Sequence, residues 1–322
     1  MNTNVSEQFE TYFKNLNYSR EPQTLYAPIG YTLSGGGKRL RPQLLILSYL
    51  LYKNNPQDVF AAAAGMEIFH NFTLLHDDVM DKAQMRRSRP TVHVKWNDNT
   101  AILSGDAMLV LAYRYLAQVP DFCHEQVQNL INETFIEVME GQQYDMDFET
   151  MPTVSVGQYM EMIRLKTSVL LAACMKLGAI LAGAPKEDCE ILYNIGINAG
   201  LAFQLQDDLL DVYGNPETFG KNVGGDICCN KKTFMYINAR LKASSQILAE
   251  LDRWEKYNGN DMSCKIEAVT GIYNTLGIRD ICIGKIDSLF QAAIDLFSTL
   301  SVTSDRCSEL RGLIESMINR NR

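Results

Sequence analysis

Two copies of the pattern Asp-Asp-x-x-Asp, each at the end of a long apolar stretch, constrain this chain more than any other feature. Their aspartates are Asp77, Asp78 and Asp81 in the first copy, and Asp207, Asp208 and Asp211 in the second. On a helix, the first and last aspartates of each copy lie one turn apart on the same face. Like charges at that spacing destabilise a helix unless something neutralises them. The pattern therefore predicts a bound cation.

A hard divalent cation fits these motifs best, because carboxylate oxygens are its preferred ligands. Magnesium in particular takes one or two carboxylates and completes its shell with water and substrate phosphate. A calcium-binding EF-hand does not fit, because its ligands lie on a 12-residue loop with a central glycine. A solvated acidic helix end is the alternative for one copy alone, and the second copy argues against it.

Basic residues accompany both acidic motifs. In chain order they are Lys38 and Arg41 in a glycine-rich stretch, Arg86 and Arg87 after the first motif, and Lys221 and Lys231 after the second. Glycines let backbone N–H groups approach an anion, while lysine and arginine supply positive charge. The stretch is not a P-loop, because the spacing GxxxxGK[ST] is missing from it. Acidic and basic groups in this order indicate a metal-bridged diphosphate, with a surface charge run as the alternative for each basic group alone.

The hydrophobic pattern is helical almost throughout. Apolar residues recur with the spacing of one helix face in residues 5–16, and seven further stretches fit helices better than strands. Those stretches are residues 44–52, 61–81, 101–118, 125–142, 156–181, 187–213 and 231–254, and the prolines fall between them. Regular strand alternation is missing from the sequence, and its one Asn-Gly dipeptide lies in residues 258–261, which we expect to form a loop near the C-terminal helices rather than a hairpin turn. The sequence predicts a single all-α domain over residues 1–322, a bundle of ten or more helices.

Composition narrows the class of protein. With 30 Lys+Arg against 38 Asp+Glu the net charge is −8, which argues against a general nucleic-acid binder. Eight dispersed cysteines without a CxxC pair predict reduced thiols and a cytoplasmic location. We expect no signal peptide and no transmembrane segment. The most apolar stretch, residues 168–185, is interrupted by Lys176 and is interpreted as a buried helix.

With these motifs, the chain resembles the polyprenyl synthetase family, the trans-isoprenyl diphosphate synthases of the farnesyl and geranylgeranyl type. The resemblance runs from Gly36 to Thr233 at least. It is carried by Gly-Gly-Lys-Arg-Leu-Arg-Pro, Asp77-Asp78-x-x-Asp81 with Arg86-Arg87, Lys166-Thr167, and Phe203-Gln204-x-Gln206-Asp207-Asp208-x-x-Asp211. It implies an isoprenoid synthase fold in which the two acidic motifs face each other across a deep central cavity.

The resemblance also implies a reaction, its participants and their ligands. An allylic diphosphate (dimethylallyl, geranyl or farnesyl) would ionise and condense with isopentenyl diphosphate in a homodimeric enzyme that binds three Mg²⁺ ions. The metal ligands would be Asp77, Asp78, Asp81, Asp207 and Asp211, with Asp208 supporting them. Arg86, Lys166, Lys221 and Lys231 would bind the allylic diphosphate, and Lys38, Arg41, His70 and Arg87 the isopentenyl diphosphate. Thr167 and Gln204 would line the reacting centre.

Product length is expected to depend on side chains one to two turns before the first acidic motif. Phe72 and Thr73 lie five and four residues before Asp77, which places Phe72 roughly 7.5 Å along the helix axis from the aspartates. A ring at that depth favours a C15 to C20 product, leaning to geranylgeranyl diphosphate. The alternative is that Phe72 is ordinary core and that the floor lies near Met108 or Leu111.

Three points stay open in the sequence. Ser88 and Asn230 stand where the family usually has glycine, which leaves the loop conformations there unsettled. His70 lies on an apolar helix, where a histidine is commonly a core residue. A class I terpene cyclase or a non-catalytic partner subunit of a prenyl synthase are the alternative functions, but the second Asp-Asp-x-x-Asp motif, together with Lys38 and Arg41, disfavours the former. The intact acidic motifs disfavour the latter.

Overall fold

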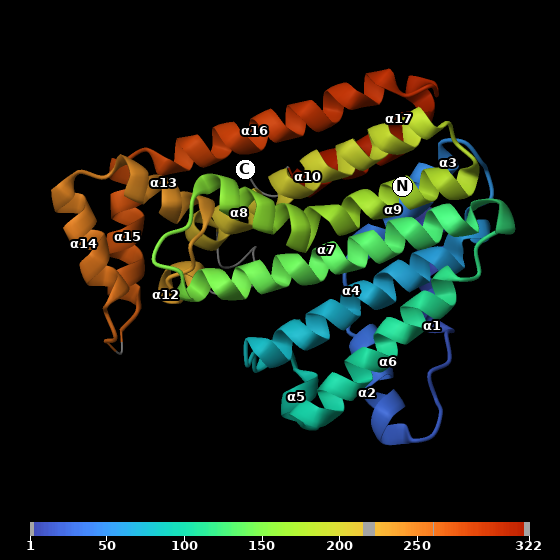
Figure 1. Ribbon diagram of the computed structural model, residues 1–322, viewed down its shortest axis with the longest axis horizontal. Helices are drawn as coiled ribbons and strands as arrows, with labels where there is room; N and C mark the ends of the chain where they lie inside the picture. Colours follow the sequence, from blue (N-terminus) through green and yellow to red (C-terminus); the bar gives the residue numbers. More distant parts are fainter. Residues whose placement is uncertain (1–2, 215–222, 260, 319–322) are drawn as a thin grey trace. The chain divides into compact units, whose positions relative to one another are not determined.

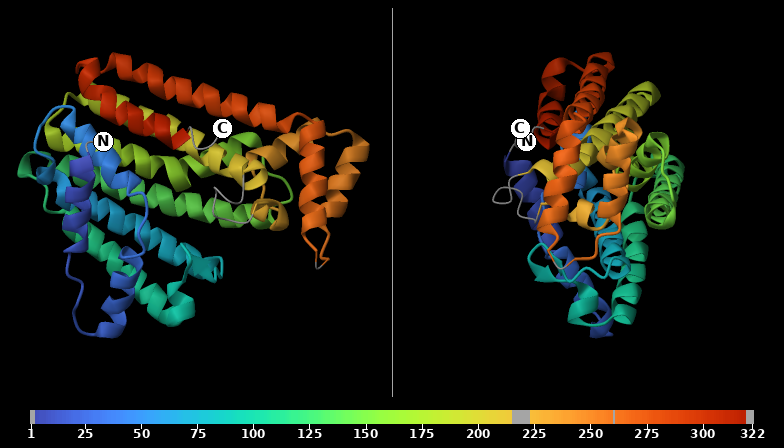
Figure 2. Two further views of the ribbon diagram at one scale, coloured as in Figure 1. Left: turned by 180° about the vertical axis from the view of Figure 1, so that it is seen from behind. Right: turned by 90° about the vertical axis from the view of Figure 1, so that its left-hand side faces the viewer.

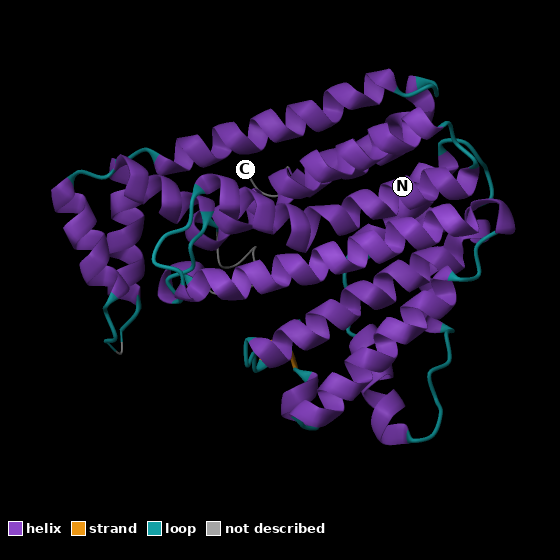
Figure 3. Ribbon diagram, viewed as in Figure 1, coloured by secondary structure: helices purple, strands orange, loops and turns teal. Residues whose placement is uncertain are grey.

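Helices make up nearly all of the computed structural model, which describes residues 3–214, 223–259 and 261–318 (Figures 1 and 3). Contacts divide the chain into two compact units. One comprises Met1–Ile131, Cys174–Leu192 and Ser301–Leu310, and the other comprises Asn132–Ala173, Tyr193–Leu300 and Arg311–Arg322. The predicted all-α class is confirmed, while the single domain over residues 1–322 stays a prediction.

Four helices contribute residues to both units. They are α7 (His124–Thr150), α9 (Val169–Ala182), α10 (Lys186–Tyr213) and α17 (Ser304–Ile318). The other helices of the first unit are α1 (Thr3–Lys14), α2 (Gln23–Leu33), α3 (Leu40–Leu50), η1 (Pro56–Val59), α4 (Phe60–Met80), α5 (Val92–Lys95), α6 (Asp98–Leu116) and η2 (Asp121–Cys123). Those of the second unit are α8 (Val156–Ile163), η3 (Arg164–Ser168), α12 (Gly225–Cys228), α13 (Phe234–Lys242), α14 (Ser245–Glu255), α15 (Ser263–Thr275), α16 (Ile278–Leu296) and η4 (Phe297–Thr299).

The first unit is organised around α4 and α6, which lie side by side (Figure 1). A Cβ on Gly65 of α4 would come within 2.7 Å of the Leu116 side chain at the far end of α6. A Cβ on Gly105 of α6 would collide with the ring of His76 on α4, and His76 Nε2 lies 3.1 Å from the Ile102 carbonyl oxygen. Contacts at both ends make the pair antiparallel, and the two glycines set its close spacing. This packing holds the last turn of α4, which carries Asp77 and Asp78.

In the second unit, glycines bring α7 and α10 close to the segment that links α8 and α9. A Cβ on Gly141 of α7 would collide with the Lys166 backbone, and one on Gly200 of α10 would lie 2.6 Å from Ser168 Cα. Further along the chain, α14 and α15 pack as a pair, visible in orange from two directions in Figure 2. The described part of the expected loop at residues 258–261 connects these two helices.

Three sequence expectations need correction. Residues 231–254 form two helices, because Ala243 is extended (ψ 140°) and Ser244 caps α14 by accepting from the Ile247 N–H at 3.4 Å. Pro28 lies inside α2, a helix that the apolar pattern did not reveal. A small hairpin also forms, in which β1 (Met85–Arg86) pairs antiparallel with β2 (Arg89–Pro90).

The apolar stretch that the sequence assigns to a buried helix is confirmed as buried. Val156–Ala182 is the one helical run among the described residues that is long and apolar enough to cross a membrane by length and composition. Its most apolar window is 83% buried inside the protein, as in a core helix.

Two glycine-to-alanine substitutions should have opposite effects on stability. Gly65→Ala should destabilise the protein by about 1–3 kcal/mol, because its methyl group overpacks the α4–α6 contact. Gly284→Ala, in the exposed middle of α16 with open space around it, should stabilise by about 0.5–1 kcal/mol. Urea unfolding of both variants measures the difference. A Gly65→Ala variant as stable as the parent would contradict the close packing.

Candidate functional site

The first acidic motif ends α4. Asp77 and Asp78 lie in its last turn, and Asp81 follows as the C-cap residue, its N–H bonded to the Asp77 carbonyl oxygen at 2.8 Å. Asp81 is exposed and Asp77 partly so, whereas Asp78 is buried. Negative charge at the C-terminal end of a helix is unfavourable, because the helix dipole already places partial negative charge there. The aspartate charges and the helix dipole therefore both favour a cation at this helix end.

Asp78 is held by Arg86. The Arg86 Nε donates to both carboxylate oxygens of Asp78, at 2.8 and 2.9 Å. Burial raises the pKa of Asp78, while the Arg86 charge opposes that shift. In this arrangement the carboxylate predicted as a metal ligand and the guanidinium predicted to bind the allylic diphosphate occupy each other. Both roles stay predictions. For Asp78 or Arg86 to bind a ligand, their ion pair must open, or the ligand must be bound by polar atoms that the ion pair does not use.

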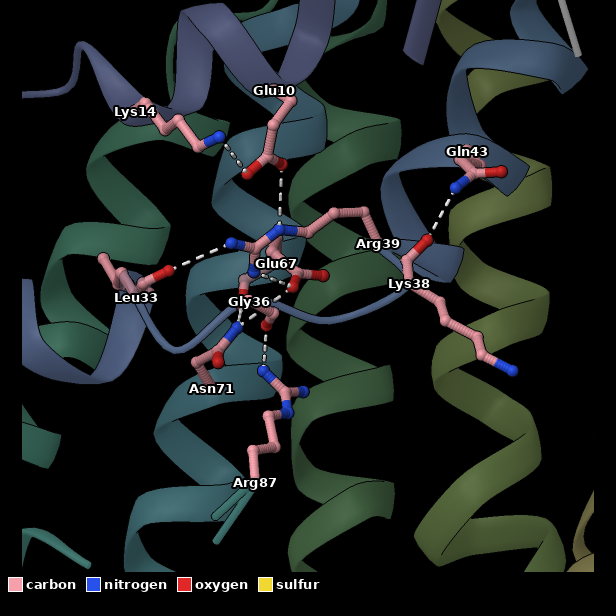
Figure 4. A network of polar contacts seen from close by, with 10 residues as sticks. All are labelled: Glu10, Lys14, Leu33, Gly36, Lys38, Arg39, Gln43, Glu67, Asn71 and Arg87. Atoms are coloured by element: carbon pink, nitrogen blue, oxygen red, sulfur yellow. Dashed lines mark hydrogen bonds and ion pairs between the residues drawn. The ribbon is translucent and has the colours of Figure 1, made fainter. Parts of the chain in front are cut away.

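The hairpin aims Arg86 and the next residue in different directions. Arg87 and Ser88 both have left-handed φ angles, 51° and 59°, as the two central residues of a tight hairpin turn require. Arg87 donates to the Gly36 carbonyl oxygen of the glycine-rich stretch (Figure 4). The hairpin thus connects the acidic end of α4 with the predicted anion-binding loop inside one unit.

Arg39 anchors that loop, a role that the sequence did not indicate. It is buried, with Nη1 donating to Glu67 at 2.8 Å and Nε donating to Glu10 at 3.2 Å. Its Nη2 donates to the Leu33 carbonyl oxygen at 3.0 Å, and its guanidinium lies 4.7 Å from the centre of the Phe13 ring. Figure 4 shows Arg39 turned towards these partners and the Lys38 side chain extending away from them. The fork geometry of arginine suits such a site, because each N–H points at a fixed acceptor.

Positive charge is concentrated around His70. Burial lowers the pKa of His70 well below its ordinary value, and the charges of Arg41, Arg87, Arg86 and Arg39 lower it further. Burial also lowers the pKa of Arg41, whose Nε is buried and forms no hydrogen bond within the described residues. Burial lowers the pKa of Arg87 too, and Arg39 and Arg86 add to that effect. His70 is therefore neutral, and the surrounding guanidinium groups favour a bound anion.

The second acidic motif lies in the last turns of α10. Asp207 and Asp211 are partly exposed, and Asp208 is buried. Asp208 accepts hydrogen bonds from the Tyr159 hydroxyl and, at 3.1 Å, from Gln204 Nε2. Burial, followed by the Asp226 charge, raises the pKa of Asp208 to about 7. The role of Asp208 in supporting the metal ligands stays a prediction.

Lys166 and Thr167 lie in η3, a π-helical segment between α8 and α9. Such segments are frequent at functional sites, because the wider turn changes the direction in which side chains project. Thr167 Oγ1 donates to Gln204 Oε1 at 3.0 Å, so the two residues predicted to line the reacting centre are in contact. Lys221 lies outside the described residues.

Asp145 of α7 brings two predicted diphosphate ligands together, and the sequence did not single it out. Its Oδ2 lies 2.6 Å from Lys166 Nζ and 3.9 Å from Lys231 Nζ. Burial alone would raise the pKa of Asp145, but Lys231 and Lys166 lower it overall. No motif separates Asp145 from the neighbouring acidic residues of α7. Asp226, whose N–H donates to Asp211 Oδ2 at 2.9 Å, was missed for the same reason.

The described residues form no preformed metal cage. Within residues 3–214, 223–259 and 261–318, no three His, Cys, Asp or Glu side chains are grouped as metal ligands would be. The outer aspartates of each motif, which are exposed or partly exposed, nevertheless fit magnesium, which binds through one or two carboxylates plus substrate phosphate rather than in a cage built by protein alone. Calcium, which takes 6–8 oxygen ligands, fits this donor set less well.

The residues predicted to set product length lie in the first unit. Phe72 is buried, with its ring centre 5.5 Å from that of Phe69 and 4.8 Å from that of His76. Thr73 Oγ1 donates to the His70 carbonyl oxygen at 2.8 Å. Met108 of α6 is fully buried as well, so Phe72 and Met108 both remain candidates for the floor.

Comparisons with known proteins identify the family of this chain. The family model for polyprenyl synthetase matches residues 22–272. The geranylgeranyl diphosphate synthase of Methanosarcina mazei is 43% identical over 223 residues, 68% of each chain. The short chain isoprenyl diphosphate synthase of Methanocaldococcus jannaschii is 40% identical over 238 residues, 73% of this chain and 70% of that protein.

Solved structures give the same result. A crystal structure of a geranylgeranyl pyrophosphate synthase matches all of this chain and all of its own, with a TM-score of 0.94 and 41% identity. The match with the crystal structure of geranylgeranyl pyrophosphate synthetase from Pyrococcus horikoshii covers 98% of this chain and 95% of that chain, with a TM-score of 0.89 and 29% identity. This chain belongs to the polyprenyl synthetase family.

Proposed function

We propose that the protein is a Mg²⁺-dependent prenyltransferase that condenses isopentenyl diphosphate with an allylic diphosphate to give a C15 to C20 trans-prenyl diphosphate. The observation that carries the proposal is the hairpin of the first unit. It links the acidic end of α4 through Arg86 with the arginine-rich surroundings of His70 through Arg87. Acidic and basic groups held this close suit a substrate that is a metal-bound diphosphate.

The residues have distinct roles in this reaction. Asp77, Asp81, Asp207 and Asp211 would hold the metal ions, which neutralise the departing pyrophosphate, and Asp78 would join them if Arg86 releases it. Arg86, Lys166, Lys221 and Lys231 would bind the allylic diphosphate, with Thr167 and Gln204 beside the reacting carbon. Lys38, Arg41, His70 and Arg87 would hold the isopentenyl diphosphate, and neutral His70 can donate one hydrogen bond to it.

The chemistry is ionisation, condensation and elimination. The allylic C–O bond breaks and pyrophosphate leaves, stabilised by fixed positive charge. The double bond of isopentenyl diphosphate then forms the new C–C bond, and a proton passes to the departing pyrophosphate. No protein nucleophile takes part. Apolar side chains around the reacting carbon keep water from the cation.

Pyrophosphate release tests this function against its two alternatives. We expect release only when isopentenyl diphosphate, Mg²⁺ and an allylic diphosphate, geranyl or farnesyl, are all present. Release from an allylic diphosphate alone would instead favour a terpene cyclase, and no release with either allylic diphosphate would favour a non-catalytic subunit.

Asp77→Asn and Asp207→Asn should each lower kcat by at least about 100-fold, because each removes a carboxylate that would hold a metal ion against the departing pyrophosphate. The Mg²⁺ concentration needed for half-maximal rate should also rise. Asp147→Asn, on the exposed face of α7, is the matched control and should leave both quantities unchanged. The metal role fails if either site variant keeps the parent rate and Mg²⁺ requirement.

Phe72→Ala should lengthen the product beyond C20, because it removes a ring from the expected floor of the chain pocket. Phe72→Leu, which keeps most of the volume, should retain the parent product length. Chromatography of the dephosphorylated products measures both, with Met108→Ala in parallel. Longer products from Met108→Ala alone would move the floor to α6.

We propose further that the protein is a cytoplasmic homodimer. The α6 face with Ile102, Leu103 and Val110 exposes 43%, 60% and 67% of these side chains, and an apolar face of this kind suits burial against a second copy. All eight cysteines lie in the described residues and are free thiols, as a reducing compartment requires. Sedimentation equilibrium should give about twice the 36.3 kDa chain mass. Leu103→Glu should shift it to the monomer, whereas a parent monomer would exclude the dimer.

A further inference from the structure

Lys265 of α15 is a buried lysine with no carboxylate within ion-pair distance among the described residues. Only 2% of its surface is exposed. Its Nζ donates to Asn230 Oδ1 at 2.8 Å and to the Cys228 carbonyl oxygen at 3.3 Å. A buried charge of this kind is costly unless its donors are satisfied. The cost indicates that the two acceptors are needed to stabilise the buried Lys265 charge. Both acceptors lie just before Lys231 in the chain.

Asn230 joins Lys265 to the end of α14. Its Oδ1 accepts from Lys265, and its Nδ2 donates to the carbonyl oxygen of Glu255, the last residue of α14, at 2.9 Å. Its φ of 54° is left-handed, where asparagine is tolerated and glycine is the default residue. Glycine would suit the backbone here, but it could form neither side-chain bond. The departure from the glycine expected at this position thus has a structural reason.

Lys231 follows directly and depends on this anchor. Its side chain is 46% exposed and reaches to 3.9 Å from Asp145 Oδ2. Its backbone N–H donates to the Asp226 carbonyl oxygen at 2.9 Å, and its own carbonyl oxygen accepts from Thr233 N–H at 2.9 Å. A long, partly exposed side chain is placed chiefly by where its backbone begins. Fixing the backbone at residue 230 therefore fixes the position to which the Lys231 side chain can extend.

We infer that Asn230 and Lys265 form a positioning pair that holds Lys231 for binding the diphosphate of the allylic substrate. The inference rests on the proposed function, since it assigns the pair to the same site. Neither residue touches substrate. They act through Lys231, whose Nζ is the group that would contact the anion.

Lys265→Met and Asn230→Gly test the pair. Each should raise KM for the allylic diphosphate about tenfold, because a hydrogen bond to a charged group that orients Lys231 is lost. KM for isopentenyl diphosphate should stay within about twofold of the parent. The effects in the double variant should be less than additive, because both changes remove the same bond between Lys265 and Asn230. Rates are referred to the folded fraction measured by thermal unfolding.

Thr270→Val is the matched control on the same helix. Its Oγ1 is buried and unpartnered within the described residues, so the substitution keeps the shape of the side chain and leaves Asn230 untouched. It should keep both KM values. Asn230 is exposed, so Asn230→Gly is expected to fold even if Lys265→Met does not. Unchanged allylic KM in Asn230→Gly, equal changes in both KM values, or additive effects in the double variant would overturn the pairing.

Calorimetry with inorganic pyrophosphate and Mg²⁺ separates this inference from the proposed function. Lys265→Met and Asn230→Gly should bind pyrophosphate about tenfold more weakly than the parent and than Thr270→Val. Weaker binding in a protein that performs no condensation would refute the proposed function and support the pair. Parent-like binding by both variants of an active enzyme would refute the pair alone.

Discussion

Repulsion between like charges is the constraint on which the rest of this site depends. Burial, and then the guanidinium groups around it, lower the pKa of His70, and burial together with Arg39 and Arg86 lowers the pKa of Arg87. At the end of α4, Asp77 and Asp81 stand where the helix dipole already disfavours negative charge. A metal–diphosphate complex would offset both kinds of repulsion, because it would offer cations to the carboxylates and phosphate oxygens to the arginines.

The middle aspartate of each motif is stabilised inside the protein, and by different means. Asp78 accepts two bonds from Arg86, whereas Asp208 accepts from Tyr159 and Gln204. A buried carboxylate needs such partners, since burial without hydrogen bonds is costly. Fixing the middle residue fixes the helix end, and the outer aspartates are left more exposed. Each Asp-Asp-x-x-Asp motif therefore combines a structural position with the two positions that are predicted to bind metal.

The acidic motifs, most of the helices and the family could be predicted from the sequence, because each is visible in the spacing of residues close together in the chain. The roles of Asp145, Tyr159 and Asp226 could not be predicted, because each of them contacts a partner on another element. Asp145 contacts Lys166 from 21 residues away, and Tyr159 contacts Asp208 from 49. Helical periodicity identifies the face of one element and not what packs against it. The break at Ala243 was missed for a related reason, since alanine and serine also occur within helices and only the cap at Ser244 reveals the boundary.

Backbone strain is concentrated where the charged motifs are. The non-glycine residues with left-handed φ in the described chain are Arg39, Lys82, Arg87, Ser88 and Asn230, and each adjoins an acidic or basic motif. Residues in such conformations persist only where surrounding contacts hold them, at about 1–3 kcal/mol each. Asn230 has two side-chain bonds to offset the strain, whereas Ser88 forms no side-chain hydrogen bond within the described residues. The turn at Ser88 is therefore held from outside, by the β1–β2 pairing and by the bonds that Arg86 and Arg87 form. The arginine contacts that keep the hairpin in place are the same ones for which the predicted diphosphate ligands would compete.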